Sequence, residues 1–505
     1  MQIINSIVTW LNFKRVYQID LFKKFPFDAQ QEVLFKLIDM AKKTEFGKKY
    51  HFHSIRSIKE YQERVPLQTY DSLKPYIERL MHGEQNILWP SDIRWFAKSS
   101  GTTSDKSKFI PVSSEALEDC HFRGGKDVLA LYALNYPETE IFKGKGLTLG
   151  GSHQINKINN ESFYGDLSAI LIENLPFWAH FIKTPSQEIA LMSEWEEKLE
   201  KITEATIQEN VTSIAGVPSW TLVLLKYILE KTGAKNILEV WPNLELFTHG
   251  GVSFQPYREQ FKKLIPKDNM NYMETYNASE GFFAVQDYPL RDDMLLMLDY
   301  GIFFEFIPIE ELEKENPRAF HIDDVELNKN YAIVISTNAG LWRYMIGDTV
   351  IFTSKYPHKI KISGRTKHFI NVFGEEVIID NAESALKIAC EKTGALLKDY
   401  TAAPIFMGTD TKGAHQWLIE FEQEPESIDQ FARILDESLQ QVNSDYEAKR
   451  YKSITLDQLE VIKAKPNLFY QWLKEKGKIG GQNKVPRLSN SRQYIDELLE
   501  LNNKL

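Results

Sequence analysis

The middle of the chain alternates between helix-like and strand-like patterns, and this alternation constrains the fold more than any other feature of the sequence. Apolar residues follow a helical period over residues 195–210 and 218–232, whereas residues 211–215 and 244–248 form short apolar runs typical of buried strands. Strands that alternate with helices in this way build a sheet whose faces the helices cover. We therefore predict an α/β fold in which ligands bind at the carboxyl ends of the strands.

The flanking regions have different patterns. Residues 1–85 indicate mainly helices, residues 295–353 are rich in strand patterns, and the segment after about residue 365 mixes both in a smaller α+β unit. A chain of 505 residues exceeds what one compact core organises. We predict a large N-terminal domain over residues 1–364, with β-sheets flanked by helices, and a smaller α+β C-terminal domain over residues 365–505.

Local signals predict individual elements. Ser113 is expected to cap a helix that begins near Glu115, because its hydroxyl can accept from the first-turn amides. Gly47 is expected to end the N-terminal helical run, and the glycines of residues 144–150 are expected to lie in turns. Further helices are predicted at 70–80, 381–393, 427–442 and 467–476, and further strands at 93–97, 109–112, 331–337 and 344–352.

Charge and cysteine content narrow the function classes. The formal net charge of −10 disfavours a broad nucleic-acid surface, and we interpret the lysines near the C-terminus as a solvated helical face. The chain has two cysteines, Cys120 and Cys390, which excludes a disulfide framework and fits a reducing cytoplasm. No stretch approaches about 20 consecutive apolar residues, so no membrane-spanning helix is expected. The sequence predicts a cytoplasmic protein with small-molecule partners.

A small polar loop lies between the two strands predicted at 93–97 and 109–112. Hydroxyl side chains surround Gly101, which permits close approach of backbone amides, and Lys98, Lys106 and Lys108 add positive charge. Such a loop can surround phosphate oxygens with donors while lysine offsets their charge. The alternative is a surface turn, and the spacing does not match a Walker loop.

This loop, Ser99-Ser-Gly-Thr-Thr-Ser104 with Lys106, resembles the phosphate loop of the adenylate-forming superfamily, which includes acyl-CoA synthetases, peptide-synthetase adenylation domains and luciferases. More specifically, the chain resembles the auxin-responsive acyl acid–amido synthetase family, including its bacterial members. Further motifs of that family occur in the same order along nearly the whole chain: Val65-Pro-Leu-Gln-Thr-Tyr-Asp71 with Lys74-Pro-Tyr-Ile-Glu-Arg79, Tyr276-Asn-Ala-Ser-Glu280, Leu341-Trp-Arg-Tyr-Met-Ile-Gly-Asp348 and Gln482-Asn-Lys-Val-Pro-Arg487.

The resemblance implies a nucleotide site. Tyr276 would stack on adenine, with Gly250 and Gly251 giving the base close backbone access, and Asp348 would accept from the ribose hydroxyls. On residue type alone, Tyr276 fits core packing equally well and the Gly-Asp pair fits a turn. The implied nucleotide-binding residues are Ser99, Ser100, Gly101, Thr102, Thr103, Gly250, Gly251, Tyr276, Ser279, Asp348 and Arg365.

The resemblance also implies the metal and the catalytic cation. Glu280 would be the Mg²⁺ ligand, although it could instead cap the following segment. Lys484 would bridge the attacking carboxylate and the α-phosphate, although a tail lysine is ordinarily solvated. Arg365 would approach the ribose or the α-phosphate from a hinge at residues 364–367, and the resemblance implies that a mobile C-terminal domain rotates about this hinge between the two steps. This hinge, with Gly374-Glu-Glu376, resembles acyl-CoA synthetases more than plant amido synthetases and puts plant substrate preferences in doubt.

The implied enzyme is an AMP-forming ligase. ATP and a carboxylic acid would give acyl-AMP and pyrophosphate in the N-terminal domain, and the acyl group would then pass to the amine of an amino acid. Two alternatives stay open, namely an acyl-CoA synthetase that uses CoA as acceptor and a non-catalytic nucleotide-binding regulator. Arg123 or Lys126, on the helix after the phosphate loop, would meet a second carboxylate of the substrate or face solvent.

Overall fold

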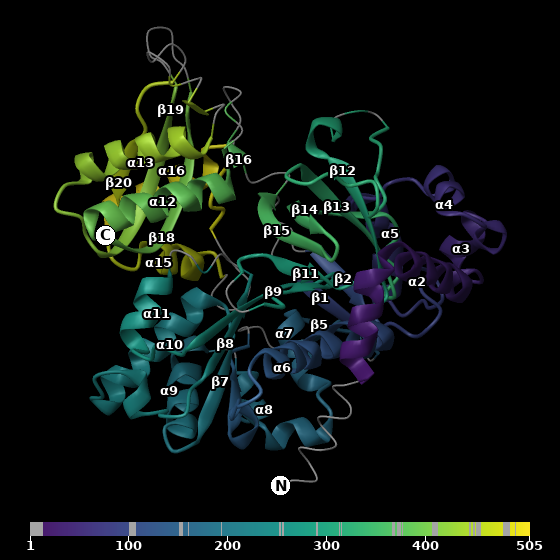
Figure 1. Ribbon diagram of the computed structural model, residues 1–505, viewed down its shortest axis with the longest axis horizontal. Helices are drawn as coiled ribbons and strands as arrows, with labels where there is room; N and C mark the ends of the chain where they lie inside the picture. Colours follow the sequence, from purple (N-terminus) through teal and green to yellow (C-terminus); the bar gives the residue numbers. More distant parts are fainter. Residues whose placement is uncertain are drawn as a thin grey trace.

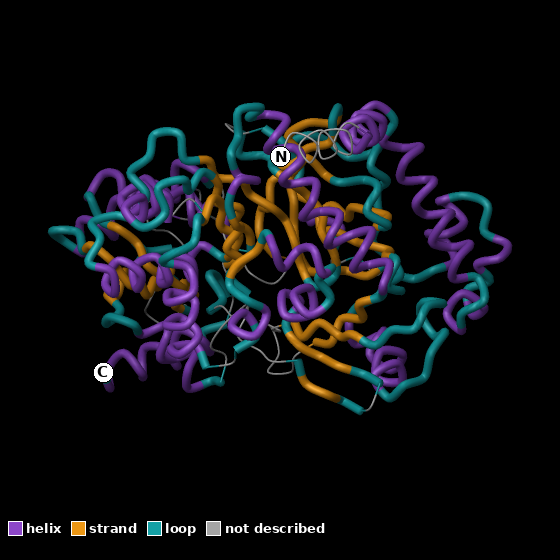
Figure 2. Tube along the Cα trace, turned by 90° about the horizontal axis from the view of Figure 1, so that it is seen from below, coloured by secondary structure: helices purple, strands orange, loops and turns teal. Residues whose placement is uncertain are grey.

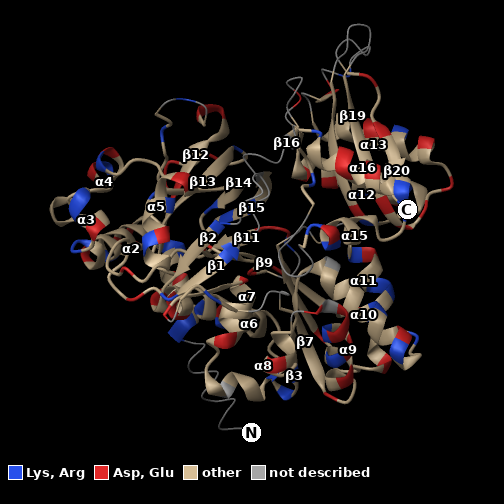
Figure 3. Cartoon of the chain, turned by 180° about the vertical axis from the view of Figure 1, so that it is seen from behind, with Lys and Arg blue, Asp and Glu red and all other residues tan. Residues whose placement is uncertain are grey.

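The chain forms a large lobe and a smaller C-terminal lobe that begins near α12 (Ile379–Thr393) (Figure 1). Among the described residues, no helix combines the length and apolar character needed to cross a bilayer. Acidic and basic side chains are interspersed along the helices of both lobes (Figure 3). The structure, a computed structural model, describes residues 14–505 except 100–107, 151–154, 160, 193, 252–253, 255–256, 289–290, 313, 315, 366–368, 371–374, 376, 407–412, 444–445, 448–449, 451–455, 478–484 and 490.

An 11-stranded sheet forms the centre of the large lobe among the described residues. Its β9-β8-β7-β3-β6 half is parallel, and its β12-β13-β14-β15-β11-β10 half pairs antiparallel. The helices α9 (Trp195–Thr206), α10 (Pro218–Thr232) and α11 (Arg258–Leu264) follow the parallel strands in sequence, because parallel neighbours need crossover connections. The strands are β3 (Lys145–Thr148), β6 (Lys183–Thr184), β7 (Val211–Gly216), β8 (Leu246–Gly250), β9 (Asn271–Ala278), β10 (Gly281–Val285), β11 (Met294–Leu296), β12 (Ile302–Pro308), β13 (Asn330–Thr337), β14 (Tyr344–Lys355) and β15 (His358–Arg365).

Helices pack on both faces of this sheet (Figure 2). The helices that follow the parallel strands bury an apolar cluster that includes Leu225, Trp241 and Phe261. The N-terminal helices, including α5 (Tyr70–Met81), bury a larger cluster around Trp89 and Trp342. A second sheet in the order β2-β1-β5-β4 contains the hairpin of β1 (Trp95–Ser99) and β2 (Lys108–Val112), with β4 (Asn156–Lys157) and β5 (Phe163–Gly165).

The C-terminal lobe is a three-stranded sheet of β18 (Leu396–Ile405), β19 (Ala414–Gln423) and β20 (Glu460–Lys463) with helices on both sides. Successive strand residues face opposite sides, so Ala402 and Trp417 lie in one apolar cluster while Ala403 and Leu418 lie in another. The first cluster is completed by α12 and α13 (Ile428–Val442), and the second by α15 (Leu468–Glu475) and α16 (Gln493–Lys504). The predicted α/β fold with a smaller α+β unit is confirmed.

Local predictions were mostly confirmed, with two corrections. The helix predicted at 218–232 is α10, and the Ser113 hydroxyl accepts from the Ala116 amide at 2.9 Å as the cap prediction requires. Gly47 does not end a helix; it lies inside α3 (Glu45–Lys49), where the Thr44 hydroxyl accepts from its amide. The glycines of residues 144–150 are not simply turns, because residues 145–148 form the inner strand β3.

Candidate nucleotide and acyl-transfer site

The carboxyl ends of β8 and β9 bring together two of the predicted motifs. In the parallel pairing of these strands, Gly250 lies opposite Thr275, one residue before Tyr276. A side chain at Gly250 would place its Cβ 2.5 Å from the Thr275 carbonyl oxygen, and Gly251 has a φ of 78°, which favours glycine. Close approach of the neighbouring backbone therefore requires glycine at position 250, and the positive φ favours glycine at position 251.

Tyr276 on β9 and Asp348 on β14 meet directly. The Tyr276 hydroxyl donates to Asp348 Oδ2 at 2.6 Å, and both residues are buried. Three strands separate β9 from β14 in the sheet, which on a flat sheet would place them about 19 Å apart. The contact therefore requires a strongly twisted and curled sheet, whose curvature brings two distant motifs into one site. The Tyr276 ring also packs edge-on against the Phe283 ring, with 4.8 Å between the ring centroids, so it contributes to core packing as well.

The predicted hinge residue lies beside Asp348. Asp348 pairs with Arg365 in the register of β14 and β15, and Gly364 has a φ of 147°. The backbone of Arg365 is thus placed next to the Tyr276–Asp348 contact. The following residues, 366–368, lie outside the described part of the chain, as does the side chain of Arg365.

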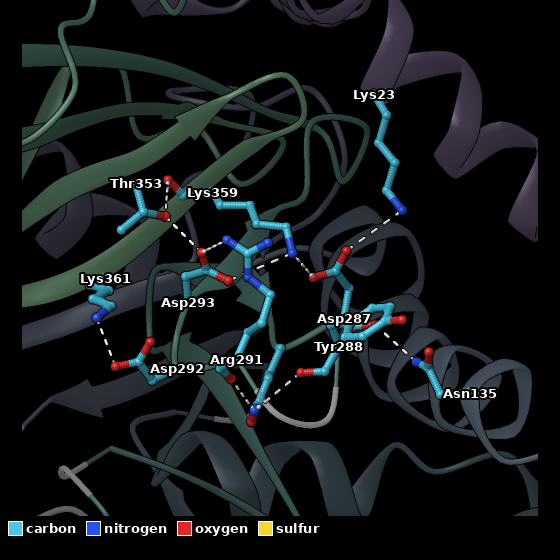
Figure 4. A network of polar contacts seen from close by, with 11 residues as sticks. Lys23, Asn135, Asp287, Tyr288, Arg291, Asp292, Asp293, Thr353, Lys359 and Lys361 are labelled. Atoms are coloured by element: carbon cyan, nitrogen blue, oxygen red, sulfur yellow. Dashed lines mark hydrogen bonds and ion pairs between the residues drawn. The ribbon is translucent and has the colours of Figure 1, made fainter.

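The strand that leads to this hinge is held by buried charges (Figure 4). Lys359 Nζ lies 2.7 Å from Asp287 Oδ1 and 3.6 Å from Asp293 Oδ1, and all three side chains are buried. At the more exposed edge, Lys361 pairs with Asp292 at 2.7 Å. These ion pairs tie β15 to the connection between β10 and β11, so the start of the hinge is fixed to the large lobe.

The β9–β10 turn contains Ser279 and the predicted metal ligand Glu280. Ser279 is buried, and its hydroxyl makes no hydrogen bond within the described residues, so it can still donate to a ligand. Glu280 is half-buried in the same turn. A π-helical segment, Ala116–Phe122, lies against this turn, where the Phe282 amide donates to Cys120 Sγ at 3.1 Å. Nothing in the sequence pattern signalled this wide helical turn, although such turns occur often at functional sites.

The predicted phosphate loop lies at the tip of the β1–β2 hairpin. Ser99 ends β1 and pairs with Lys108, whereas Ser100, Gly101, Thr102 and Thr103 lie outside the described residues. The loop end of the hairpin is held by Tyr70, whose hydroxyl accepts from the Phe109 amide at 2.9 Å. Burial raises the pKa of Tyr70. The motif that contains Tyr70 therefore supports the hairpin from α5, a contact that sequence reasoning missed.

Arg343, within the motif that ends at Asp348, forms a buried clamp rather than part of the nucleotide site. Its guanidinium donates to Glu305 at 2.9–3.2 Å and to the carbonyl oxygens of Gln62 and Val65 at 2.7 Å. The Arg343 side chain is 7% exposed and that of Glu305 is 0% exposed. This clamp fixes the start of β14, five residues before Asp348. The motif signalled the importance of Arg343, but no sequence signal pointed to Glu305.

The C-terminal motif docks near the end of β8. Arg487 donates to Asp399, to the Tyr400 carbonyl oxygen at 3.0 Å and to the Tyr257 hydroxyl at 2.9 Å. Tyr257 belongs to the large lobe and lies six residues after Gly251. Lys484, three residues before Arg487, lies outside the described residues. The structure therefore places Arg487, three residues after Lys484, against the large lobe.

The pKa values of two titratable groups on the neighbouring strands β8 and β9 are strongly shifted. Burial raises the pKa of Glu274 to about 7, and the nearby carboxylates of Glu383 and Asp292 add to this shift. Burial lowers the pKa of His249 to about 3, with Arg258 contributing in the same direction. Parallel neighbours in register share a face, so His249 and Glu274 lie on the same face of the sheet. At neutral pH His249 is uncharged and Glu274 titrates.

Arg123 is half-buried, and its guanidinium is already paired within the protein. It lies 3.2 Å from Asp299 Oδ2 and also donates to the Asp299 carbonyl oxygen at 3.2 Å. Arg15 and Asp127 complete this cluster, with Arg15 bound to both Asp127 and Asp299. The alternative in which Arg123 meets a substrate carboxylate is therefore not favoured, because a protein carboxylate occupies its donors. Lys126 lies on the same helix, α6 (Arg123–Asn135).

Profiles of the GH3 family match three segments: the N-terminal domain at residues 15–270, the central domain at 295–365 and the C-terminal domain at 380–493. Among sequences, the chain is 24% identical to the indole-3-acetic acid-amido synthetase GH3.3 of Arabidopsis thaliana, over 91% of this chain and 89% of that protein. It is also 24% identical to the 4-substituted benzoates-glutamate ligase GH3.12 of Arabidopsis thaliana, over 93% of this chain and 94% of that protein.

Solved structures share the fold. The GH3.15 acyl acid amido synthetase superposes with a TM-score of 0.77 at 17% identity, covering 94% of this chain and 93% of that chain. A 2-hydroxyisobutyryl-CoA ligase in its postadenylation state superposes with a TM-score of 0.60 at 11% identity, covering 94% of this chain and 91% of that chain. The same architecture is thus present in an amido synthetase and in a CoA ligase.

Proposed function

Because the chain belongs to the GH3 family, as its sequence motifs predicted, we propose that it activates a carboxylic acid with ATP and joins the acyl group to the amine of an amino acid. It is an adenylate-forming ligase of the amido synthetase type, similar to enzymes that conjugate indole-3-acetic acid or benzoates. The observation that carries the proposal is the Tyr276–Asp348 hydrogen bond beside Gly250, which unites three of the predicted nucleotide motifs.

Adenylation requires a carboxylate to attack the α-phosphate of ATP, so the protein has to offset repulsion between two anions and align them. We assign the phosphates to the hydroxyls and amides of residues 99–103 and the ribose hydroxyls to Asp348. Asp348 Oδ2 accepts from Tyr276, and a carboxylate has lone pairs for further donors. Lys484 is assigned to the charge that develops between the carboxylate and the α-phosphate.

Glu280 fits a magnesium ligand. The described residues contain no group of three or more His, Cys, Asp or Glu side chains that could hold a metal ion. Mg²⁺ is commonly bound by one or two carboxylates together with substrate phosphates and water, so a single carboxylate at the β9–β10 turn is sufficient. When bound, Mg²⁺ would neutralise phosphate charge, and Glu280 would hold it at the turn next to Ser279.

Amide formation requires a different arrangement of the same groups. We propose that the C-terminal domain, residues 365–505, reorients about the hinge at residues 364–367 after pyrophosphate leaves. The acceptor amine then attacks the acyl carbon and loses a proton. The bond between the acyl carbon and the phosphate oxygen breaks, and AMP departs. Closure of the two lobes would also keep water away from the mixed anhydride. The fixed β15 and the glycine at position 364 support this placement of the hinge.

The proposal is tested by acid-dependent exchange of radiolabelled pyrophosphate into ATP, followed by product analysis with single amino acids and with CoA. We expect exchange with at least one acid of a panel and an amide product with an amino acid. A thioester product in place of the amide would identify an acyl-CoA synthetase, and tight ATP binding with no exchange for any acid would identify a regulator.

Lys484→Ala should lose exchange by more than a hundredfold, because the charge at the transition state is no longer compensated. Lys476→Ala is the matched control, because Lys476 pairs with Glu497 at 3.1 Å on the exposed surface of the same lobe. Normal exchange in Lys484→Ala, or an equal loss in both variants, would contradict the assignment of Lys484.

A further inference from the structure

Two buried polar atoms beside the proposed nucleotide site have no partner in the described chain. His121 lies on the π-helical segment Ala116–Phe122 and is 4% exposed, yet its Nδ1 makes no hydrogen bond among the described residues. Asn277 lies on β9, one residue after Tyr276, and its Oδ1 is likewise buried without a hydrogen bond there. Because buried polar atoms in folded proteins are almost always hydrogen-bonded, this pair indicates a bound ligand or an ordered water molecule.

Packing of the π-helical segment against β10 brings the two side chains together. Phe282 pairs with Asn277 across the β9–β10 hairpin, and the Phe282 amide donates to Cys120 Sγ, one residue before His121. A Cβ at Gly124 would lie 2.5 Å from the Phe282 ring, so the helix backbone lies directly on the hairpin. The helix and the hairpin therefore hold the imidazole next to the Asn277 amide.

The pair is uncharged at neutral pH. Burial lowers the pKa of His121 to about 4, and the neighbouring Asn277 amide opposes this shift. The neutral imidazole offers one donor and one acceptor, and Asn277 Oδ1 offers a further acceptor. Arg123, two residues after His121, already binds Asp299. A second carboxylate on a substrate therefore has no matching charge in this pair, whereas a hydroxyl group can donate to one atom and accept from the other.

The pair is open to a small molecule. Asn277 as a whole is half-buried, although its Oδ1 is buried, so the site is not sealed inside the core. Gly125 lies four residues after His121, on the same side of the helix, and is exposed. A Cβ at Gly125 would meet nothing in the described chain within 4 Å apart from its own helix. The helix face next to the imidazole therefore borders open space.

The position of the pair relates it to the acyl acid. Asn277 and Glu280 belong to one hairpin and are three residues apart, which a chain spans with at most about 11 Å. Glu280 is the proposed magnesium ligand at the phosphates, and the attacking carboxylate has to lie against the α-phosphate. Successive strand residues face opposite sides, so Asn277 points away from the face on which Tyr276 would stack on adenine. The pair therefore lies on the side left for the acid.

We propose that His121 and Asn277 form a specificity subsite for an uncharged hydroxyl group of the acyl acid, so that the enzyme adenylates hydroxy acids in preference to unsubstituted and dicarboxylic acids. The hydroxyl donates to Asn277 Oδ1 and accepts from the N–H of His121. An acid without this hydroxyl leaves buried polar atoms unpaired, which disfavours its binding and its reaction. This inference rests on the proposed function and names the class of its acid substrate.

The test compares acids that differ in one group. Acid-dependent pyrophosphate exchange is measured with benzoic, phenylacetic and butyric acids, with their monohydroxylated derivatives and with derivatives that carry a second carboxylate. We expect at least one hydroxy acid to exceed its unsubstituted parent by about tenfold or more in kcat/KM, because the parent leaves the polar pair without a partner. No dicarboxylic derivative should exceed its parent.

Variants show whether the pair causes this preference. His121→Phe keeps a ring and removes both nitrogens, so the preference should fall below about threefold while the unfolding temperature stays at the wild-type value or rises. Asn277→Ala should lose the preference as well, and it tests the subsite through a second side chain. His321→Phe is the matched control and should keep the preference, because His321 is a buried imidazole packed against Phe27 and Phe303, with Nε2 lacking a hydrogen bond in the described chain.

Three results would overturn the inference. A wild-type enzyme that prefers unsubstituted or dicarboxylic acids would show that the pair binds only water. A hydroxyl preference that survives in both His121→Phe and Asn277→Ala would show that the hydroxyl binds elsewhere, and an equal loss in His321→Phe would show an indirect effect. The absence of exchange with every acid would instead refute the proposed function, and the inference with it.

Discussion

Replacing Tyr276 with phenylalanine tests the centre of the proposed nucleotide site with the loss of one oxygen atom. The ring keeps its packing against Phe283, and its capacity to stack on adenine is unchanged. The hydrogen bond to Asp348 is lost. If Tyr276 serves only as an aromatic surface, the substitution has little effect, whereas a role in orienting Asp348 predicts a defect in ATP use.

The magnitude follows from the geometry. The bond is 2.6 Å long, its acceptor is a carboxylate, and Tyr276 and Asp348 are 4% and 6% exposed. A buried hydrogen bond to a charged group contributes about 1.5–3 kcal/mol, which corresponds to roughly tenfold to 150-fold in kcat/KM for ATP. We expect most of this change in the KM for ATP, because the proposed contact of Asp348 with the ribose would be made in the ground state and in the transition state alike.

The assay is pyrophosphate exchange over a range of ATP concentrations, repeated with 2′-deoxy-ATP and in a double-mutant cycle with Asp348→Ala. The two substitutions should be strongly non-additive, because each removes the same contact. Tyr300→Phe is the control, since its hydroxyl donates to Asp127 at 2.7 Å in a buried pair of the same chemistry outside the site. A KM for ATP within twofold of wild type in Tyr276→Phe, with additive effects in the cycle, would refute the reasoning.

Two further predictions concern stability. Glu305→Leu leaves the Arg343 guanidinium buried without its carboxylate and should lower the free energy of unfolding by about 3–5 kcal/mol. The double variant with Arg343→Met should restore much of this loss. An equal loss in the single and the double variant, measured by denaturant unfolding, would contradict the clamp. Glu274 has its pKa raised from 4.5 to about 7, so the folded protein binds the extra proton in this range and stability falls as pH rises from 4.5 to 7. Glu274→Gln should therefore stabilise the protein at pH 8 by about 1–3 kcal/mol and by much less at pH 5, and an equal effect at both pH values would show that Glu274 does not titrate in this range.

Short-range patterns in the sequence predicted most of the elements. The helix at 218–232 and the strands at 331–337 and 211–215 were found within one residue of their bounds, because a hydrophobic period is a property of the segment itself. The glycine at 146 was misjudged because its neighbours are distant in sequence. It lies inside β3, where a Cβ would lie 3.1 Å from the Ser213 hydroxyl oxygen of the neighbouring strand β7.

The π-helical segment at Ala116–Phe122 shows the same limit. Its residues read as an ordinary helix start, with Ser113 as the cap, and this cap is present. The wider turn follows from packing against the β9–β10 hairpin, where Cys120 Sγ accepts from the Phe282 amide. A difference of this size in backbone path depends on a partner 162 residues away, which no local pattern encodes.

The sequence by itself determined the family, the two-part α/β organisation and the segments in which the chemistry was to be sought. The tertiary structure decided which side chains act together: Tyr276 with Asp348 across 72 residues, Arg487 with Tyr257 across 230, and Arg343 with Glu305 across 38. The physical reason is that helix and strand preferences sum over neighbouring residues, whereas a buried hydrogen bond depends on the path of the whole chain. Only the curl of the sheet brings Tyr276 to Asp348, and only the docking of the C-terminal lobe brings Arg487 to Tyr257.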